Sequence, residues 1–66
     1  MIEVGQIRKW CHTNKGGVFL VVELPDDYPN DPAFVSSWVR YIQDGKECFD
    51  KFECIELNSE VICEAG

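Results

Sequence analysis

Hydrophobic and polar residues alternate in short segments along the chain, and glycines and prolines separate these segments. Successive side chains of a strand point to opposite faces, so this pattern is typical of strands with one buried face. No segment carries the sustained 3.6-residue hydrophobic stripe of an amphipathic helix. We therefore expect four strands in the first part of the chain, at Val4–His12, Val18–Leu24, Phe34–Gln43 and Lys46–Phe52.

Two turn signals join these expected strands into hairpins. Thr13–Gly17 ends in a pair of glycines, which adopt positive φ without steric cost. Asp44 and Gly45 stand between two apolar runs and predict a two-residue type I′ turn, which requires positive φ at both positions.

Two further segments are less regular. Pro25–Pro32 holds all three prolines of the chain and predicts a loop, and long loops in compact domains are often functional. Glu53–Glu64 allows two interpretations. One is a helical turn near Phe52–Cys54 followed by a strand at Val61–Cys63, and the other is a hairpin that turns at Asn58–Ser59.

Four to six short antiparallel strands within 66 residues bury their apolar faces only if the sheet curls over on itself. A flat sheet would leave one side wet and two edges open. The predicted fold class is all-β. We expect a single domain, residues 1–66, that forms a small, strongly bent antiparallel barrel of about five strands.

The order of several segments resembles a known group of folds. Val4-Gly5-Gln6-Ile7, then Gly17–Val21, then Trp38–Tyr41 followed by Asp44-Gly45-Lys46 resemble the pattern of small SH3-like and Tudor-like barrels. Many similar examples are short bacteriophage proteins. The resemblance implies an SH3-like barrel from Val4 to Phe52 and a phage-encoded protein.

Charge and composition narrow the classes of function. Six Lys and Arg against twelve Asp and Glu give a formal net charge of -6, which disfavours non-specific nucleic-acid binding. The hydrophobic content of 45% predicts a folded chain. The longest apolar run, Val18–Val22, is far shorter than the ~20 residues of a membrane span, and no signal-peptide pattern follows Met1. We expect a soluble, cytoplasmic protein.

The four cysteines are expected to be free thiols, because we expect the protein to be in a reducing compartment. The sequence context agrees, since each of Cys48, Cys54 and Cys63 stands beside a large apolar residue. Zinc is the competing interpretation. It is disfavoured because structural zinc ligands come in pairs two to four residues apart. Here Cys48 and Cys54 are separated by five residues, and Cys11 and His12 are adjacent. We expect no metal and no cofactor.

Catalytic signals are absent from the sequence. His12 has no Ser or Asp partner fixed by spacing, and no phosphate-binding loop or metalloprotease motif occurs. The acidic residues of the Pro25–Pro32 loop lack the pattern of a calcium loop and are expected to be solvated. The sequence therefore predicts a protein that is not an enzyme.

Strand alternation gives the candidate binding residues. It places Arg8, Trp10 and His12 on one face of the first strand, and Trp38 and Arg40 on one face of the third. If both faces border one groove, the tryptophans can stack on a planar ligand while the guanidinium groups bind its anion, or the groove can hold an acidic partner segment. The alternative is that each Trp is a packing residue of the core.

A second arrangement uses tyrosines. The resemblance to Tudor domains implies that Tyr41, with Tyr28 from the proline-rich loop, completes an aromatic pocket for a cation, which an acidic surround favours. Tyr41 and Trp38 occupy opposite faces of the same strand, so only one of them can point into the barrel.

Three functions are compatible with these features. The first is a non-enzymatic interaction module, a phage product that binds a host protein. The second is a binder of a nucleotide-like anion, held by the Trp and Arg residues between subunits of a homo-oligomer. The third is nucleic-acid binding by an SH3-like surface, for which the few cations would have to cluster. We expect a protein partner.

Overall fold

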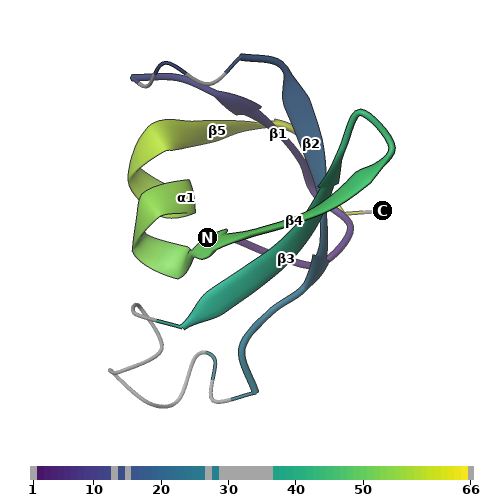
Figure 1. The fold of residues 1–66 in the computed structure, drawn as a ribbon, viewed down its shortest axis with the longest axis vertical. Coiled ribbons are helices and arrows are strands. Elements are labelled where there is room, and N and C mark those ends of the chain that lie inside the picture. Colours follow the sequence, from purple (N-terminus) through teal and green to yellow (C-terminus); the bar gives the residue numbers. More distant parts are fainter. Residues whose placement is uncertain (1, 13, 15, 27, 29–36, 66) are drawn as a thin grey trace.

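The protein folds as one curved antiparallel sheet with a short helix (Figure 1). The computed structural model describes residues 2–12, 14, 16–26, 28 and 37–65. In chain order the elements are β1 (Ile7–Trp10), β2 (Val18–Glu23), β3 (Trp38–Gln43), β4 (Lys46–Lys51), α1 (Phe52–Asn58) and β5 (Ser59–Cys63). The strands are arranged β4-β3-β2-β1-β5, and every neighbouring pair is antiparallel.

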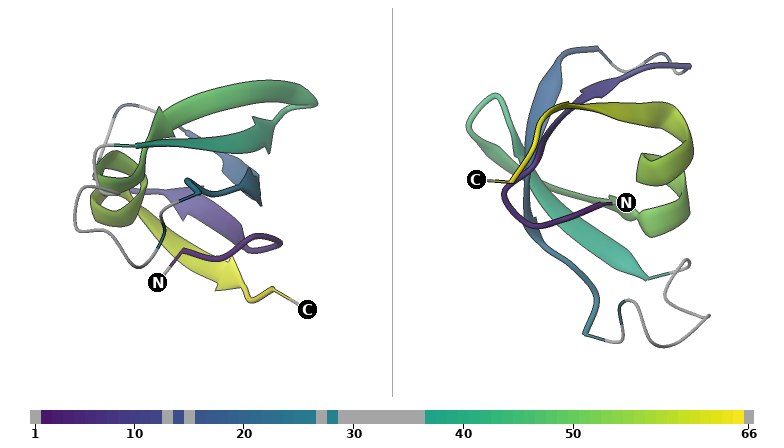
Figure 2. Two further views of the ribbon diagram at one scale, coloured as in Figure 1. Left: turned by 90° about the horizontal axis from the view of Figure 1, so that it is seen from below. Right: turned by 180° about the vertical axis from the view of Figure 1, so that it is seen from behind.

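The sheet bends around its own interior without closing. Its two edge strands are β4 and β5, and α1 connects them across the opening on the concave side (Figures 1 and 2). The expectation was a strongly bent antiparallel barrel of about five strands, and its coarser part is confirmed: the described residues form a mostly β fold, with five antiparallel strands in a single sheet and one helix.

The hairpin between β3 and β4 is the element that the sequence predicted most closely. Asp44 and Gly45 have φ values of 55° and 75°, as a type I′ turn requires. Gln43 pairs with Lys46 directly before and after the turn, so the turn fixes the register of the whole hairpin.

The first strand is shorter than Val4–His12, because positive φ interrupts it at both ends. Gly5 has a φ of 95° and His12 a φ of 57°, and neither value is compatible with extended backbone. The chain before β1 still follows β2, since the Gly5 amide donates to the Val21 carbonyl and the Val21 amide donates to the Gln6 carbonyl.

For the segment Glu53–Glu64, the interpretation of a helical turn followed by a strand is close to the structure, which has α1 followed by β5. The alternative hairpin at Asn58–Ser59 is wrong. The helix is longer than one turn because Phe52 and Ile55, three residues apart, both reach the core. The expected third strand begins at Trp38 in the structure. Its predicted residues 34–36, and most of the proline-rich loop, lie outside the described residues.

The core occupies the concave side of the sheet, under α1. Its centre is a group of three rings: the Trp10 ring lies 4.5 Å from Phe19 and 5.7 Å from Tyr41, and the Phe19 and Tyr41 rings are 4.7 Å apart. The buried hydrophobic residues among those described are Ile2, Trp10, Phe19, Val21, Val39, Tyr41, Phe52 and Ile55.

One charged side chain is buried with this core. Arg8 is only 4% exposed, and its guanidinium donates from Nε to Ser59 Oγ (2.8 Å), from Nη2 to the Ser59 carbonyl (3.0 Å) and from Nη1 to Gln6 Oε1 (3.0 Å). The Ser59 hydroxyl donates in turn to the carbonyl of Ile55, so the end of α1 belongs to the same network. A buried charge is tolerated because these acceptors replace its water.

Replacing Arg8 with methionine is expected to destabilise the fold by about 2–4 kcal/mol, because it keeps an apolar stem but leaves buried oxygens without donors. Lys9→Met is the matched control: Lys9 is the next residue, exposed on the opposite face, and its replacement should change stability by about 0.5 kcal/mol or less. Denaturant unfolding of both variants measures the difference. Equal effects would show that Arg8 is not a structural residue.

Gly45→Ala should destabilise the protein by about 1 kcal/mol, because alanine adopts the positive φ of the turn at a cost. Gly16→Ala is the control. A Cβ meets nothing within 4 Å at either glycine, and only Gly45 has positive φ. Thermal unfolding should therefore show a lower Tm for Gly45→Ala alone, and similar shifts in both variants would argue against the type I′ turn.

Candidate functional site

The two candidates on β1 are core residues. Trp10 is 4% exposed, and its indole Nε1 donates to Gln43 Oε1 at 2.9 Å. Arg8 is held by Ser59 and Gln6 as described above. Neither side chain is open to a ligand, and both serve to join β1 to other elements.

The two candidates on β3 face the opposite way. Trp38 is 59% exposed and Arg40 is half-exposed, whereas Val39 and Tyr41, which alternate with them, are buried. The two Trp–Arg pairs therefore lie on opposite sides of the sheet. The condition that both pairs border one groove is therefore not met, because alternation assigns residues to a face within each strand but does not say which face points inward.

The remaining candidate on the first segment, His12, is exposed beyond the end of β1. Its positive φ ends the strand alternation that placed it beside Trp10, so it is not part of the same face. His12 is thus separated from the other predicted residues by a turn of the backbone.

The tyrosines do not form a pocket for a cation. The Tyr41 ring is enclosed by Trp10 and Phe19, and its hydroxyl donates to Asp50 Oδ2 at 3.4 Å. Tyr28 packs against the ring of Phe52 at 5.2 Å. That prediction is wrong because Tyr41 is an interior residue, and no pocket is found in the described part of the chain.

Tyr28 remains a neutral group in this setting. Burial raises the pKa of its phenol, and the nearby carboxylates of Glu56 and Glu3 raise it further. The phenol therefore keeps its proton at neutral pH.

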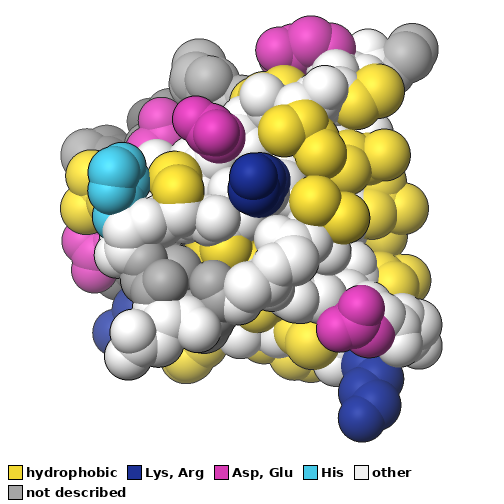
Figure 3. Space-filling view, turned by 90° about the horizontal axis from the view of Figure 1, so that it is seen from above, with side chains coloured by type: hydrophobic (Ala, Val, Ile, Leu, Met, Phe, Trp, Pro, Cys, Tyr) yellow, Lys and Arg dark blue, Asp and Glu magenta, His cyan; other side chains and the backbone are white. Residues whose placement is uncertain are grey.

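An apolar row crosses the solvent-facing side of the sheet, which we call the outer face. Ile42 on β3 pairs with Leu20 on β2, and Leu20 pairs with Ile7 on β1. Directly opposed residues of antiparallel strands point to the same side, so these three side chains share the outer face. Figure 3 shows hydrophobic side chains gathered on the side of the molecule where the β3–β4 hairpin lies in Figure 1.

An aromatic pair extends this apolar surface along β3 and β4. Phe49, which is 55% exposed, lies opposite Arg40, and Trp38 lies opposite Lys51. Trp38 and Phe49 are therefore diagonal neighbours on the outer face, a relation in which large side chains are within reach of each other.

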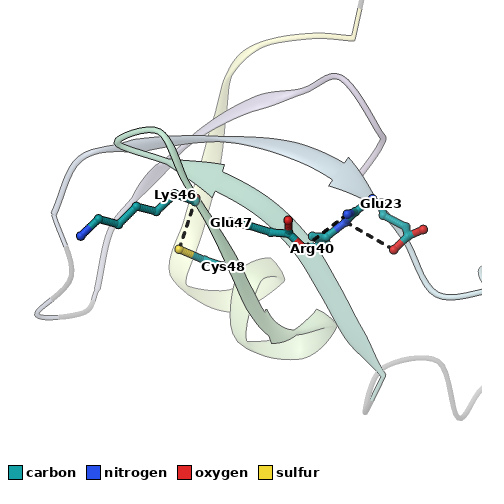
Figure 4. Close-up of polar contacts among 5 residues, drawn as sticks. All are labelled: Glu23, Arg40, Lys46, Glu47 and Cys48. Carbon is teal, nitrogen blue, oxygen red and sulfur yellow. Dashed lines mark hydrogen bonds and ion pairs between the residues drawn. The ribbon is translucent and has the colours of Figure 1, made fainter.

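Arg40 stands between the aromatic pair and the apolar row, and two carboxylates contact it (Figure 4). Its Nη1 donates to Glu47 Oε1 at 3.3 Å, and its Nε lies 3.5 Å from Glu23 Oε1 as an ion pair without hydrogen-bond geometry. We call these three residues, which span β2, β3 and β4, the Arg40 cluster. Its formal charge is negative, so Arg40 does not present a free cation to a phosphate.

Sequence reasoning missed Phe49, Ile42 and Leu20 as members of this surface. A signal for two of them was present: Ile42 has the same parity as Trp38 and Arg40, and the turn at Asp44–Gly45 sets Phe49 opposite Arg40. Leu20 had no such signal, because its pairing with Ile42 joins strands separated by the long loop.

Three further features of the described residues concern thiols, metal ligands and membrane-spanning helices. The four cysteines are free thiols, and Cys63 is exposed. The described residues include no group of three or more His, Cys, Asp and Glu placed to hold a metal ion. Among these residues, no helix has the length and apolar character needed to cross a membrane.

Comparison with known proteins gives no relative for this chain: no protein-family model, no curated protein and no solved structure matches it. The candidate site is accordingly defined by its geometry, as the outer face with its aromatic pair, its apolar row and the Arg40 cluster.

Trp38→Phe should remove the part of the fluorescence that acrylamide quenches readily, because the remaining Trp10 is buried. We expect emission at shorter wavelength and a quenching constant several-fold below that of the unaltered protein. Trp10→Phe should retain the readily quenched signal. If both tryptophans are quenched equally, the assignment of one to the core and one to the surface is wrong.

Proposed function

We propose that this protein is a non-enzymatic interaction module that binds a partner protein through its outer face. The observation that carries the proposal is the exposure of two large aromatic side chains, Trp38 and Phe49, on the same face as an apolar row. Exposed apolar patches on small soluble proteins usually mark interaction sites. Trp and other aromatic residues also supply much of the binding energy at protein interfaces.

The positions of the two arginines favour this function over binding of a nucleotide-like anion. Arg8 is engaged in the interior and Arg40 contacts two carboxylates on the surface. An anion would have to displace Glu23 and Glu47 from Arg40 and would gain nothing from Arg8. A net charge of -6 likewise disfavours a nucleic-acid backbone as the partner.

The arrangement of the elements supports the further proposal that the bent sheet is an SH3-like barrel. Five short antiparallel strands, with a helix bridging the two edge strands, are what a small barrel of this kind needs to cover its interior. Fold alone does not define function, so the proposed activity rests on the outer face. The resemblance to short bacteriophage proteins extends the proposal to a host protein as partner and to the host cytoplasm as compartment.

Partner capture with matched variants tests the proposed function. Trp38→Ala should reduce recovery of the bound protein at least tenfold, as expected for a central aromatic anchor. Leu57→Ala is the control, because Leu57 is even more exposed but lies on α1, away from the outer face. Both residues are exposed, so both variants should remain folded.

The proposal would be contradicted if Trp38→Ala captured the same partner protein as well as the unaltered chain does. Loss of capture in Leu57→Ala alone would also contradict it, because the interface would then lie on the helix.

A further inference from the structure

The charges at the middle of the outer face are unequal. The Arg40 cluster has two carboxylates for one guanidinium. Each carboxylate contacts Arg40 through a single oxygen, Oε1, and the side chains of Glu23 and Glu47 are 64% and 53% exposed. A carboxylate accepts several hydrogen bonds through its two oxygens, so both residues keep accepting capacity that faces solvent.

Apolar side chains lie on both sides of this cluster along the strands. Phe49 is directly opposite Arg40, and Trp38 lies two residues before Arg40 on β3. Ile42 lies two residues after Arg40 and begins the apolar row. Lys51 lies opposite Trp38 at the far end of the aromatic pair. A partner that covers the outer face would therefore meet the aromatic pair with Lys51 beside it, then carboxylate oxygens, then apolar surface again.

The charge of the whole chain acts in the same direction. At -6 it attracts cationic segments over the distance of a Debye length, and it opposes association with a second copy of the same chain. Once the face is covered, the local carboxylates become partly desolvated and need a cation beside them.

We infer that the occupant of the outer face is a cationic amphipathic segment of the partner protein, with an arginine or lysine side chain that contacts Glu23 and Glu47 and apolar side chains on either side of it. This inference rests on the proposed function and adds the chemistry of the partner. Arginine suits the position well, because its planar fork binds carboxylates while its faces pack on aromatic rings.

Three synthetic helical peptides of 14 residues test this inference. All three have the same leucine face. The positions on either side of that face are Arg in the first peptide, Gln in the second and Glu in the third. Binding is followed by NMR through the indole N–H signal of Trp38, and the indole of the buried Trp10 is the internal reference. We expect the Arg peptide to shift the Trp38 signal and to bind at least fivefold more tightly than the Gln peptide, with the Glu peptide weakest.

Three variants with equal net charge separate local contacts from general attraction. Glu23→Gln and Glu47→Gln should each weaken binding of the Arg peptide two- to fivefold, as expected for partly exposed ion pairs. Glu53→Gln is the matched control, because Glu53 is exposed on α1 and not on the outer face. It should bind the Arg peptide with nearly the affinity of the unaltered protein.

Several results would overturn the inference. Equal binding of the Arg and Gln peptides at the Trp38 signal would show an apolar interface without a role for charge, and the proposed function would survive. If Glu53→Gln and Glu23→Gln weaken binding of the Arg peptide equally, the effect comes from net charge and not from a local contact. If no peptide shifts the Trp38 signal, the cationic segment is wrong, whereas the proposed function is decided separately by partner capture with Trp38→Ala and Leu57→Ala.

Discussion

The guanidinium group of Arg8 connects three parts of the chain in the interior: β1 itself, the segment before it through Gln6, and the start of β5 through Ser59. Ser59 also bonds to Ile55, so α1 is fixed relative to β5 by the same group. Once Arg8 points inward, strand alternation and register follow, because Arg8 pairs with Phe19 on β2 and with Val61 on β5. The rest of the sheet takes its inner and outer sides from that orientation.

The inward orientation of Arg8 also determines which residues form the outer face. With Trp10, Phe19 and Tyr41 committed to the core, the alternate residues of the same strands remain in solvent, and they include Trp38 and Ile42. A small domain has few large side chains to spare, so exposed aromatic residues on one side imply a role outside the core. In the proposed function, stability and interaction are divided between the two sides of a single sheet.

Local features of the sequence predicted local structure well. The Asp44–Gly45 turn and the span of β2 depend on residues close in the chain, and both are nearly as expected. The side to which each Trp points was not predictable, because burial of Arg8 depends on Ser59, which is 51 residues away. The same limit applies to Arg40, whose partner Glu23 is on a strand beyond the long loop. Which residues form the candidate site depends on contacts between segments that are distant in the sequence, and strand alternation alone does not predict such contacts.

The most direct test of the division between the two sides is the exchange of the arginine side-chain Nε–H protons, measured by NMR near neutral pH. The chain has two arginines, one on each side of the sheet. The Nε–H of Arg8 is predicted to be protected from exchange and to show contacts to Ser59, whereas that of Arg40 should exchange much faster because no hydrogen bond holds it. Equal exchange at both arginines, or protection at Arg40 alone, would contradict the assignment of Arg8 to the interior and with it the assignment of the outer face.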